Sequence, residues 1–233
     1  MLGPLPPLRL RPDLLAQTVV VLCTASPPAG SSAAAIAAGR ECAALGATVA
    51  EVSLDPGAEL ADEAGAERGA HQALECHGVV DVLVNDAAGF FAAGRDPAAD
   101  HDDGLTALRG ALDCTWNATR ALANTAFLPG ARAGKVVNLA PGPAAGPRAP
   151  AARAALENMA RTLSIEWARH GVRITTVTPG ADTEPDEVAA LVAFLASPAG
   201  DYHSGCRLDL GALDAGPRRP AQLALRDPRT SSR

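Results

Sequence analysis

Short runs rich in β-branched residues alternate with longer alanine-rich stretches along most of this chain. Six runs are expected to form strands, at residues 18–24, 48–54, 79–85, 135–139, 173–178 and 207–210. The stretches expected to be helical are 31–45, 58–77, 105–126, 149–170 and 186–195. Within 149–170, Leu156, Met159, Leu163 and Trp167 recur at helical spacing and mark one apolar face. This alternation predicts parallel strands joined by right-handed crossovers.

The predicted fold class is α/β, a single Rossmann-type doubly wound parallel sheet with helices on both faces. The chain has 233 residues, without a repeat of 20–50 residues or a Ser/Gly linker, so one domain is expected over 18–212. We expect a flexible, Pro-rich N-terminus at 1–17 and a basic, disordered tail at 213–233. In such a sheet, ligands bind beyond the carboxyl ends of the strands.

Charge and cysteine content exclude several classes of partner. The net charge is −6, and since residues 215–233 carry +4, the remainder carries −10 and is not expected to bind nucleic acid. No uncharged apolar stretch approaches the length of a membrane span, so no membrane partner is expected. Five widely spaced cysteines without a C-x-x-C pair indicate a reducing cytoplasm. We expect no metal site, because His71, Cys76 and His77 do not share a helical face.

Three segments carry a resemblance to a known family. They are VDVLVNDAAG (80–89), FLPGARAGKVVNLAP (127–141) and ALENMARTLSIEWARHGVRITTVTPG (155–180). In order, they resemble the strand ending in N-N-A-G, the strand ending in N-I-S-S, and the helix and strand before P-G of the short-chain dehydrogenases/reductases. The resemblance spans about residues 18–212. It implies an oxidoreductase that uses NAD or NADP and assembles as a homo- or hetero-oligomer through the helices at 105–126 and 149–170.

The resemblance also implies a sheet order and the loss of one edge strand. Asn85 follows Ser53 by only 32 positions, and one helical stretch fills most of the interval, so the family's third strand is expected to be missing. The order expected is second run, first, third, fourth, fifth and sixth. Trp116 and Trp167 lie on the two helices implied in assembly, where they serve either core packing or a subunit contact.

Carried over position by position, the resemblance gives a set of cofactor-binding candidates. They are Ala25, Ser26, Gly30, Ser53, Asn85, Ala87, Pro179 and Gly180. The family's T-G-x-x-x-G-x-G reads TASPPAGS over residues 24–31, with no glycine at its three glycine positions unless the alignment shifts by one residue. Added Cβ atoms and two prolines predict weaker phosphate binding. Ser53 is equally compatible with contact to a phosphorylated ribose and with no contact to a ribose.

The catalytic positions of the family are replaced. Ala149 stands at the catalytic Tyr, Arg153 at the Lys, and Ala140 or Pro141 at the Ser, while Asn117 matches the helical Asn within one residue. An acid/base group of the family's kind is therefore missing at these positions, and an Arg does not readily give up a proton. Two hypotheses follow. The chain is either an NAD(P)-binding oxidoreductase that is impaired or inactive, or a non-enzymatic subunit that senses nucleotide or pairs with an active relative.

Overall fold

The computed structural model describes residues 13–27, 30–56, 63–95, 104–129 and 133–211. It contains one parallel sheet of six strands in the order β2-β1-β3-β4-β5-β6 among these residues, which confirms the expected fold class and strand order. The strands are β1 (Val19–Ala25), β2 (Thr48–Leu54), β3 (Val82–Asn85), β4 (Lys135–Leu139), β5 (Arg173–Pro179) and β6 (Cys206–Leu210).

Burial distinguishes the inner strands from the edge strand β2. All seven residues of β1 are buried, as an apolar run covered on both faces requires. In β2 the residues are exposed or partly buried except for the fully buried Leu54, and β2 pairs with β1 on one side. The described residues between β2 and β3 form the single helix α2 (Glu63–His77), so they contain no additional strand.

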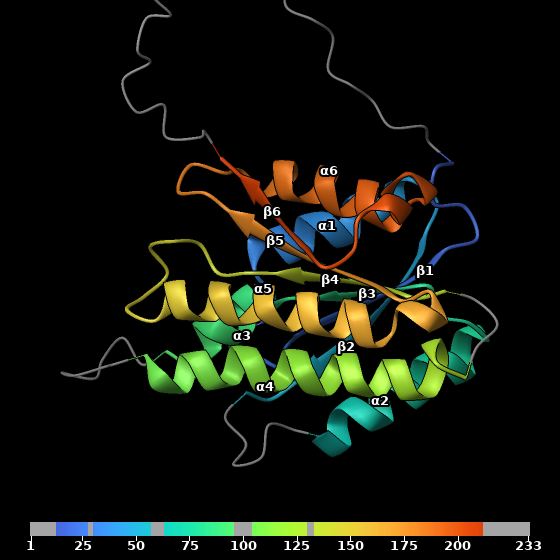
Figure 1. Cartoon of the computed structure of the whole chain (residues 1–233), viewed down its shortest axis with the longest axis horizontal. Helices are drawn as coiled ribbons and strands as arrows, with labels where there is room; N and C mark the ends of the chain where they lie inside the picture. The colour runs from blue at the N-terminus through green and yellow to red at the C-terminus, as the bar shows by residue number, and fades with distance from the viewer. Residues whose placement is uncertain (1–12, 28–29, 57–62, 96–103, 130–132, 212–233) are drawn as a thin grey trace, which may run out of the picture.

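Helices cover both faces of the sheet (Figure 1). Helices α2, α4 (Leu105–Leu122) and α5 (Ala149–Glu166) lie on one face, where Phe90, Phe127 and Leu163 belong to one apolar cluster. Helices α1 (Ala33–Ala44) and α6 (Pro185–Ala196) pack together on the other face around Leu22 and Val192. The α4 helix continues into a π-helical turn, η1 (Ala123–Phe127). Helix α5 is followed by the short 3-10 helix η2 (Ala168–His170).

Two segments differ from the sequence-based expectation. The residues after β3 form the short helix α3 (Ala87–Ala93), which the sequence analysis did not predict. This helix begins here because the Asp86 carboxylate accepts a hydrogen bond from the Gly89 N–H and caps the first turn. Residues 13–17, assigned to the flexible N-terminus, form a turn in which Leu15 is fully buried and donates its N–H to the Leu45 carbonyl at 2.9 Å. Residues 1–12 and the tail at 213–233 lie outside the described residues.

Across the part of the chain that the structure describes, no helix is both long and apolar enough to cross a membrane. The same residues contain no cluster of three or more His, Cys, Asp or Glu side chains that could hold a metal ion.

Candidate functional site

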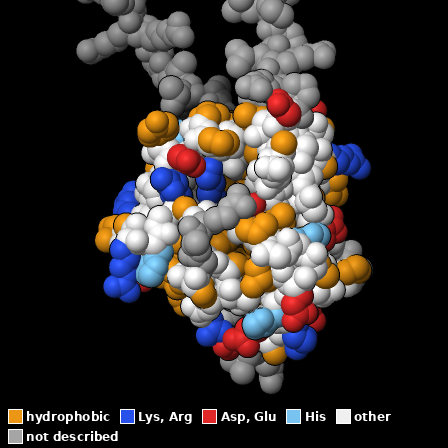
Figure 2. Space-filling view, turned by 90° about the vertical axis from the view of Figure 1, so that its right-hand side faces the viewer, with side chains coloured by type: hydrophobic (Ala, Val, Ile, Leu, Met, Phe, Trp, Pro, Cys, Tyr) orange, Lys and Arg blue, Asp and Glu red, His pale blue; other side chains and the backbone are white. Residues whose placement is uncertain are grey.

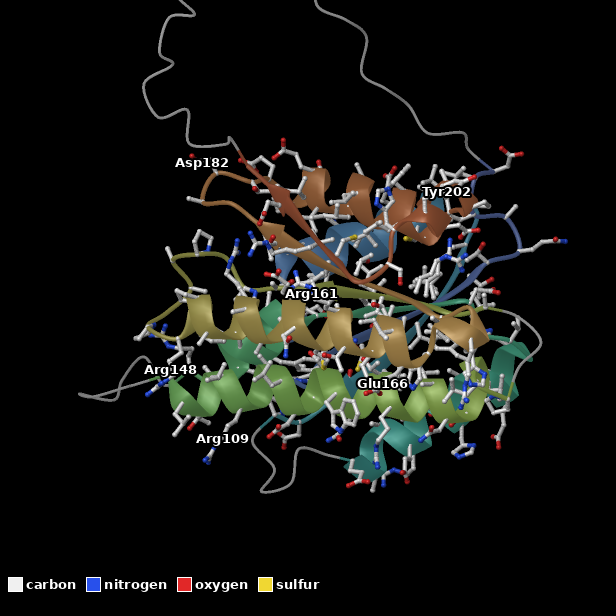
Figure 3. All side chains as sticks on the ribbon, viewed as in Figure 1. Arg109, Arg148, Arg161, Glu166, Asp182 and Tyr202 are labelled. Carbon is white, nitrogen blue, oxygen red and sulfur yellow. The ribbon has the colours of Figure 1, made fainter. Side chains whose placement is uncertain are left out.

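The candidate site lies where the strands end, at the carboxyl edge of the sheet. In Figure 3 the labelled residues Arg109, Arg148 and Asp182 lie at this end of the molecule, and Tyr202 lies at the other. The segments that follow β1, β3, β4 and β5 supply the residues that the family resemblance singled out. Helix α5 begins at this edge, directly after the loop that follows β4.

The residues at the predicted positions of the family's Tyr and Ser have no side-chain proton to donate. Ala149 is the first residue of α5 and is fully buried, so a methyl group stands where the family has a phenol. Ala140 is also fully buried, and its N–H is donated to the Val177 carbonyl at 2.9 Å. Pro141 is buried next to it and has neither a hydroxyl nor an N–H. These three positions therefore contribute packing and backbone contacts.

Arg153, at the position of the family's Lys, is held by the backbone. Its Nη1 donates to the carbonyl of Pro141 and to the carbonyl of Pro179, both at 2.8 Å. One guanidinium nitrogen thus joins the loop after β4 to the end of β5. Burial lowers the pKa of Arg153 from its ordinary value, and the nearby charge of Arg207 lowers it further. The nearby carboxylate of Asp209 acts in the opposite direction and raises it. Since an Arg stays protonated throughout the physiological range, its role here is a charged structural link.

A buried carboxylate closes the neighbouring part of the site. Asp86, directly after β3, is fully buried, and its Oδ2 accepts the N–H of Ser32 at 2.7 Å. Its Oδ1 accepts the Ser32 hydroxyl at 2.7 Å and the Gly89 N–H at 2.9 Å. Ser32 is the N-cap of α1 and also caps that helix through the Ala35 N–H. The acid therefore lies at the start of two helices, α1 and α3.

Asn85 is part of a buried polar group that sequence reasoning found only in part. Its Nδ2 donates to Thr119 Oγ1 and to Asn138 Oδ1, both at 2.9 Å. Asn117, the predicted remnant of the helical Asn, is half-buried on α4, and it is Thr119, two residues further on, that reaches Asn85. The parallel register pairs Asn85 with Asn138, and that pairing is a consequence of the sheet order.

The other predicted cofactor positions are distributed along the same edge. Ala25 ends β1, and the Ser26 N–H is donated to the Leu54 carbonyl at 2.8 Å. Gly30 has a φ of 67°, and Ser53 is exposed on the edge strand. Ala87 is fully buried at the start of α3.

Pro179 and Gly180 lead into a short turn, 180–184, in which Gly180 N–H donates to Thr183 Oγ1 at 2.8 Å. That turn joins β5 directly to α6. The described chain thus has no inserted segment covering the site between these two elements.

The single lysine and the single tyrosine lie away from this edge. Lys135 starts β4, and its Nζ contacts the Ala196 and Ser197 carbonyls at 3.1 and 2.6 Å and Asp201 Oδ1 at 2.6 Å. Lys135, Ala196 and Asp201 line a cavity of about 300 Å³ at the amino end of the sheet. Figure 2 views that end and shows basic and acidic side chains intermixed. Tyr202, in the 3-10 helix η3 (Pro198–Tyr202), is 92% exposed there and cannot act at the carboxyl edge.

A sequence model for the family described as Enoyl-(Acyl carrier protein) reductase matches residues 18–183 of this chain. A galactitol 2-dehydrogenase (L-tagatose-forming) of Cereibacter sphaeroides is 30% identical over 227 residues, covering 81% of this chain and 86% of that enzyme. The chain therefore belongs to the short-chain dehydrogenase/reductase family. A peroxisomal 2,4-dienoyl-CoA reductase of Danio rerio is 31% identical over 142 residues, 57% of this chain and 45% of that protein's length.

Solved structures support the fold at lower identity. The citronellol catabolism dehydrogenase AtuB of Pseudomonas aeruginosa superimposes with a TM-score of 0.68 at 23% identity, covering 86% of this chain and 96% of the other. A hydroxysteroid dehydrogenase from Escherichia coli gives a TM-score of 0.67 at 16% identity, with 84% and 96% covered. At these identities the likeness concerns the fold.

Members of this family generally bind NAD or NADP, and the residues of this site do not fit that group. A dinucleotide places its pyrophosphate at the N-terminus of the helix after the first strand. Here the Ser32 N–H at the start of α1 is already donated to a buried carboxylate of this chain. The guanidinium at the Lys position is tied to the Pro141 and Pro179 carbonyls. One N–H at the start of α1 and the guanidinium of Arg153 are therefore already engaged within the chain.

Proposed function

We propose that this chain is a short-chain dehydrogenase/reductase by descent whose catalysis of hydride transfer is impaired or lost. The observation that carries the proposal is the Arg153 guanidinium, held by the Pro141 and Pro179 carbonyls beside a fully buried Ala149. A positioned acid/base group contributes about 10²- to 10⁴-fold to a rate, and none stands at the family's catalytic positions. The lone tyrosine lies at the opposite end of the sheet and cannot compensate.

Carbonyl reduction by the purified chain tests this proposal directly. A panel of ketones, aldehydes and enoyl thioesters with NADH and then NADPH should give no oxidation of the nucleotide above the protein-free background. The double substitution Ala149→Tyr with Arg153→Lys should also give none, since Ala140 or Pro141 stands at the predicted Ser position. Clear turnover by the double variant would weaken the proposal, and turnover by the unmodified chain would overturn it.

An alternative form of the proposal is a non-enzymatic subunit that senses nucleotide or pairs with an active family member through α4 and α5. Two large apolar side chains support pairing, since Trp116 on α4 is 41% exposed and Ile165 on α5 is 74% exposed. Trp167, by contrast, packs partly buried against the core. Sedimentation of the chain alone and mixed with an active relative, with and without Ile165→Glu, tests the pairing. Loss of a complex in the variant is the expected result.

We place this protein in the cytoplasm as part of the same proposal. All five cysteines are free, which suits a reducing compartment.

A further inference from the structure

Asp86 is a buried carboxylate that contacts the start of α1, the helix after the first strand, where dinucleotide-binding sheets place a phosphate. It follows Asn85 where the family motif has a second Asn, and its side chain is fully buried. The N–H groups at a helix N-terminus attract anions because they lack partners within the helix. In this chain the anion at the start of α1 is supplied by a residue 54 positions further along the sequence.

The local geometry is built around this carboxylate. Both of its oxygens accept hydrogen bonds, Oδ2 from the Ser32 N–H and Oδ1 from the Ser32 hydroxyl and the Gly89 N–H, at 2.7 to 2.9 Å. At Gly89 a Cβ would lie 2.3 Å from Asp86 Oδ2, so only glycine leaves room for the acid. Asp86 is also the N-cap of α3, so its carboxylate lies at the starts of two helices.

A second anion at this place meets an unfavourable field. The partial positive charge of the α1 N-terminus is already matched by a full negative charge in a solvent-excluded position, where screening by salt and water is weak. A pyrophosphate approaching Ser32 would compete with Asp86 for the same N–H and would lie next to a like charge.

We propose that Asp86 occupies, from within the chain, the anion position at the start of α1 and thereby excludes the pyrophosphate of NAD and NADP. Asp86 thus acts as a specificity-determining residue that disfavours the binding of dinucleotides at this site. This inference deepens the proposed function and rests on it, because it favours the partner subunit over the nucleotide sensor.

Calorimetric titration of the full chain with NADH and with NADPH tests the inference. The test variant is Asp86→Asn, which removes the charge and restores the family's second Asn. The matched control is Asp81→Asn, which removes one charge at the amino end of the same strand, where the half-buried Asp81 accepts the Val19 N–H at 2.9 Å. We expect no saturable binding to the unmodified chain at millimolar nucleotide, affinity at least about tenfold higher in Asp86→Asn, and no gain in Asp81→Asn.

Three results would overturn the inference: no gain in Asp86→Asn, an equal gain in Asp81→Asn, or micromolar binding by the unmodified chain. The last does not depend on whether a variant folds, and Asp86→Ser provides a second uncharged side chain if Asp86→Asn is unstable. Micromolar binding without carbonyl turnover would remove this inference and leave the loss of catalysis standing. Turnover by the unmodified chain would remove the proposed function itself.

Discussion

Helices α1 and α6 lie side by side on one face of the sheet, both have twelve residues, and their N-termini are neutralised in opposite ways. At α6 every element is local: Pro185 takes the first position, Asp186 and Glu187 follow, and the Glu187 carboxylate accepts the Glu184 N–H at 2.9 Å. The first turn of α1 has no acidic residue. Its negative charge comes from Asp86, which is distant in sequence and fully buried.

The difference shows that a capping contact at a helix N-terminus has different consequences when it is exposed and when it is buried. The capping contact of α6 is exposed, so water can replace most of what it supplies. The contact at α1 lies between the start of that helix, a strand end and α3, and its acceptor Asp86 is fully buried, so water replaces less of what it supplies. A buried remote contact therefore couples the sheet to two helices, and an exposed local one stabilises a single turn.

Removing the buried acceptor should have the largest effect on stability. Asp86→Ala removes the acceptor of the buried Gly89 N–H and of the half-buried Ser32 N–H. We expect a loss of about 2–3 kcal/mol in the free energy of unfolding, measured by urea denaturation. Asp81→Ala should lose about 1 kcal/mol, and an equal loss in the two variants would remove the contrast between the enclosed and the half-exposed acid.

The contribution of Asp86 to the free energy of unfolding should depend on pH. Burial raises the pKa of Asp86 above its ordinary value of 3.8, although hydrogen bonds from Ser32 and Gly89 lower it. The folded chain then holds the proton more tightly than the unfolded chain, so this stabilisation is fully present below about pH 3.8 and is lost as pH rises through the raised pKa. The destabilisation caused by Asp86→Ala should therefore be larger in acid than at neutral pH. Urea denaturation across that range would contradict this if the difference were constant.

Arg153 provides an intermediate case, a remote contact that is half-buried. Arg153→Ala removes the donor shared by the Pro141 and Pro179 carbonyls, and we expect a loss of about 1–2 kcal/mol. The matched control on the same helix is Arg161→Ala, whose exposed side chain pairs with Glu157 one turn away and should cost less than about 0.5 kcal/mol. Thermal denaturation of both variants separates the two roles, and equal shifts would show that Arg153 is not a structural link.

The smallest effect is expected at the exposed start of α6. Glu187→Ala removes the acceptor of the Glu184 N–H and should cost about 0.5–1 kcal/mol. Glu187→Gln keeps an acceptor oxygen and should lose less than the Ala variant. A loss at Glu187 as large as that at Asp86, measured in the same denaturation series, would break the comparison between the two helices.

Much of the fold was predictable because strand and helix signals are local. The fully apolar run at 19–23 identifies a buried strand, and helical spacing from Leu156 to Leu163 identifies the buried face of α5. Helix α3 was missed, since seven residues are too few for a periodic pattern and its start depends on the side chain of Asp86. At the site, the sequence identified Ala149, Arg153 and Pro141 as replacements through the resemblance.

By itself, the alternation of strand and helix signals in the sequence determined the class of fold, because hydrophobic periodicity is a local property. The strand order and the replacement of the family's proton donors followed from the resemblance to the family. Only the tertiary structure decided what the remaining charges do. In the folded chain Arg153 donates to two backbone carbonyls, and the buried Asp86 accepts the Ser32 N–H. Tyr202 and Lys135 lie at the amino end of the sheet. Each of these contacts joins residues brought together by crossovers between parallel strands, and no local pattern encodes such a pairing.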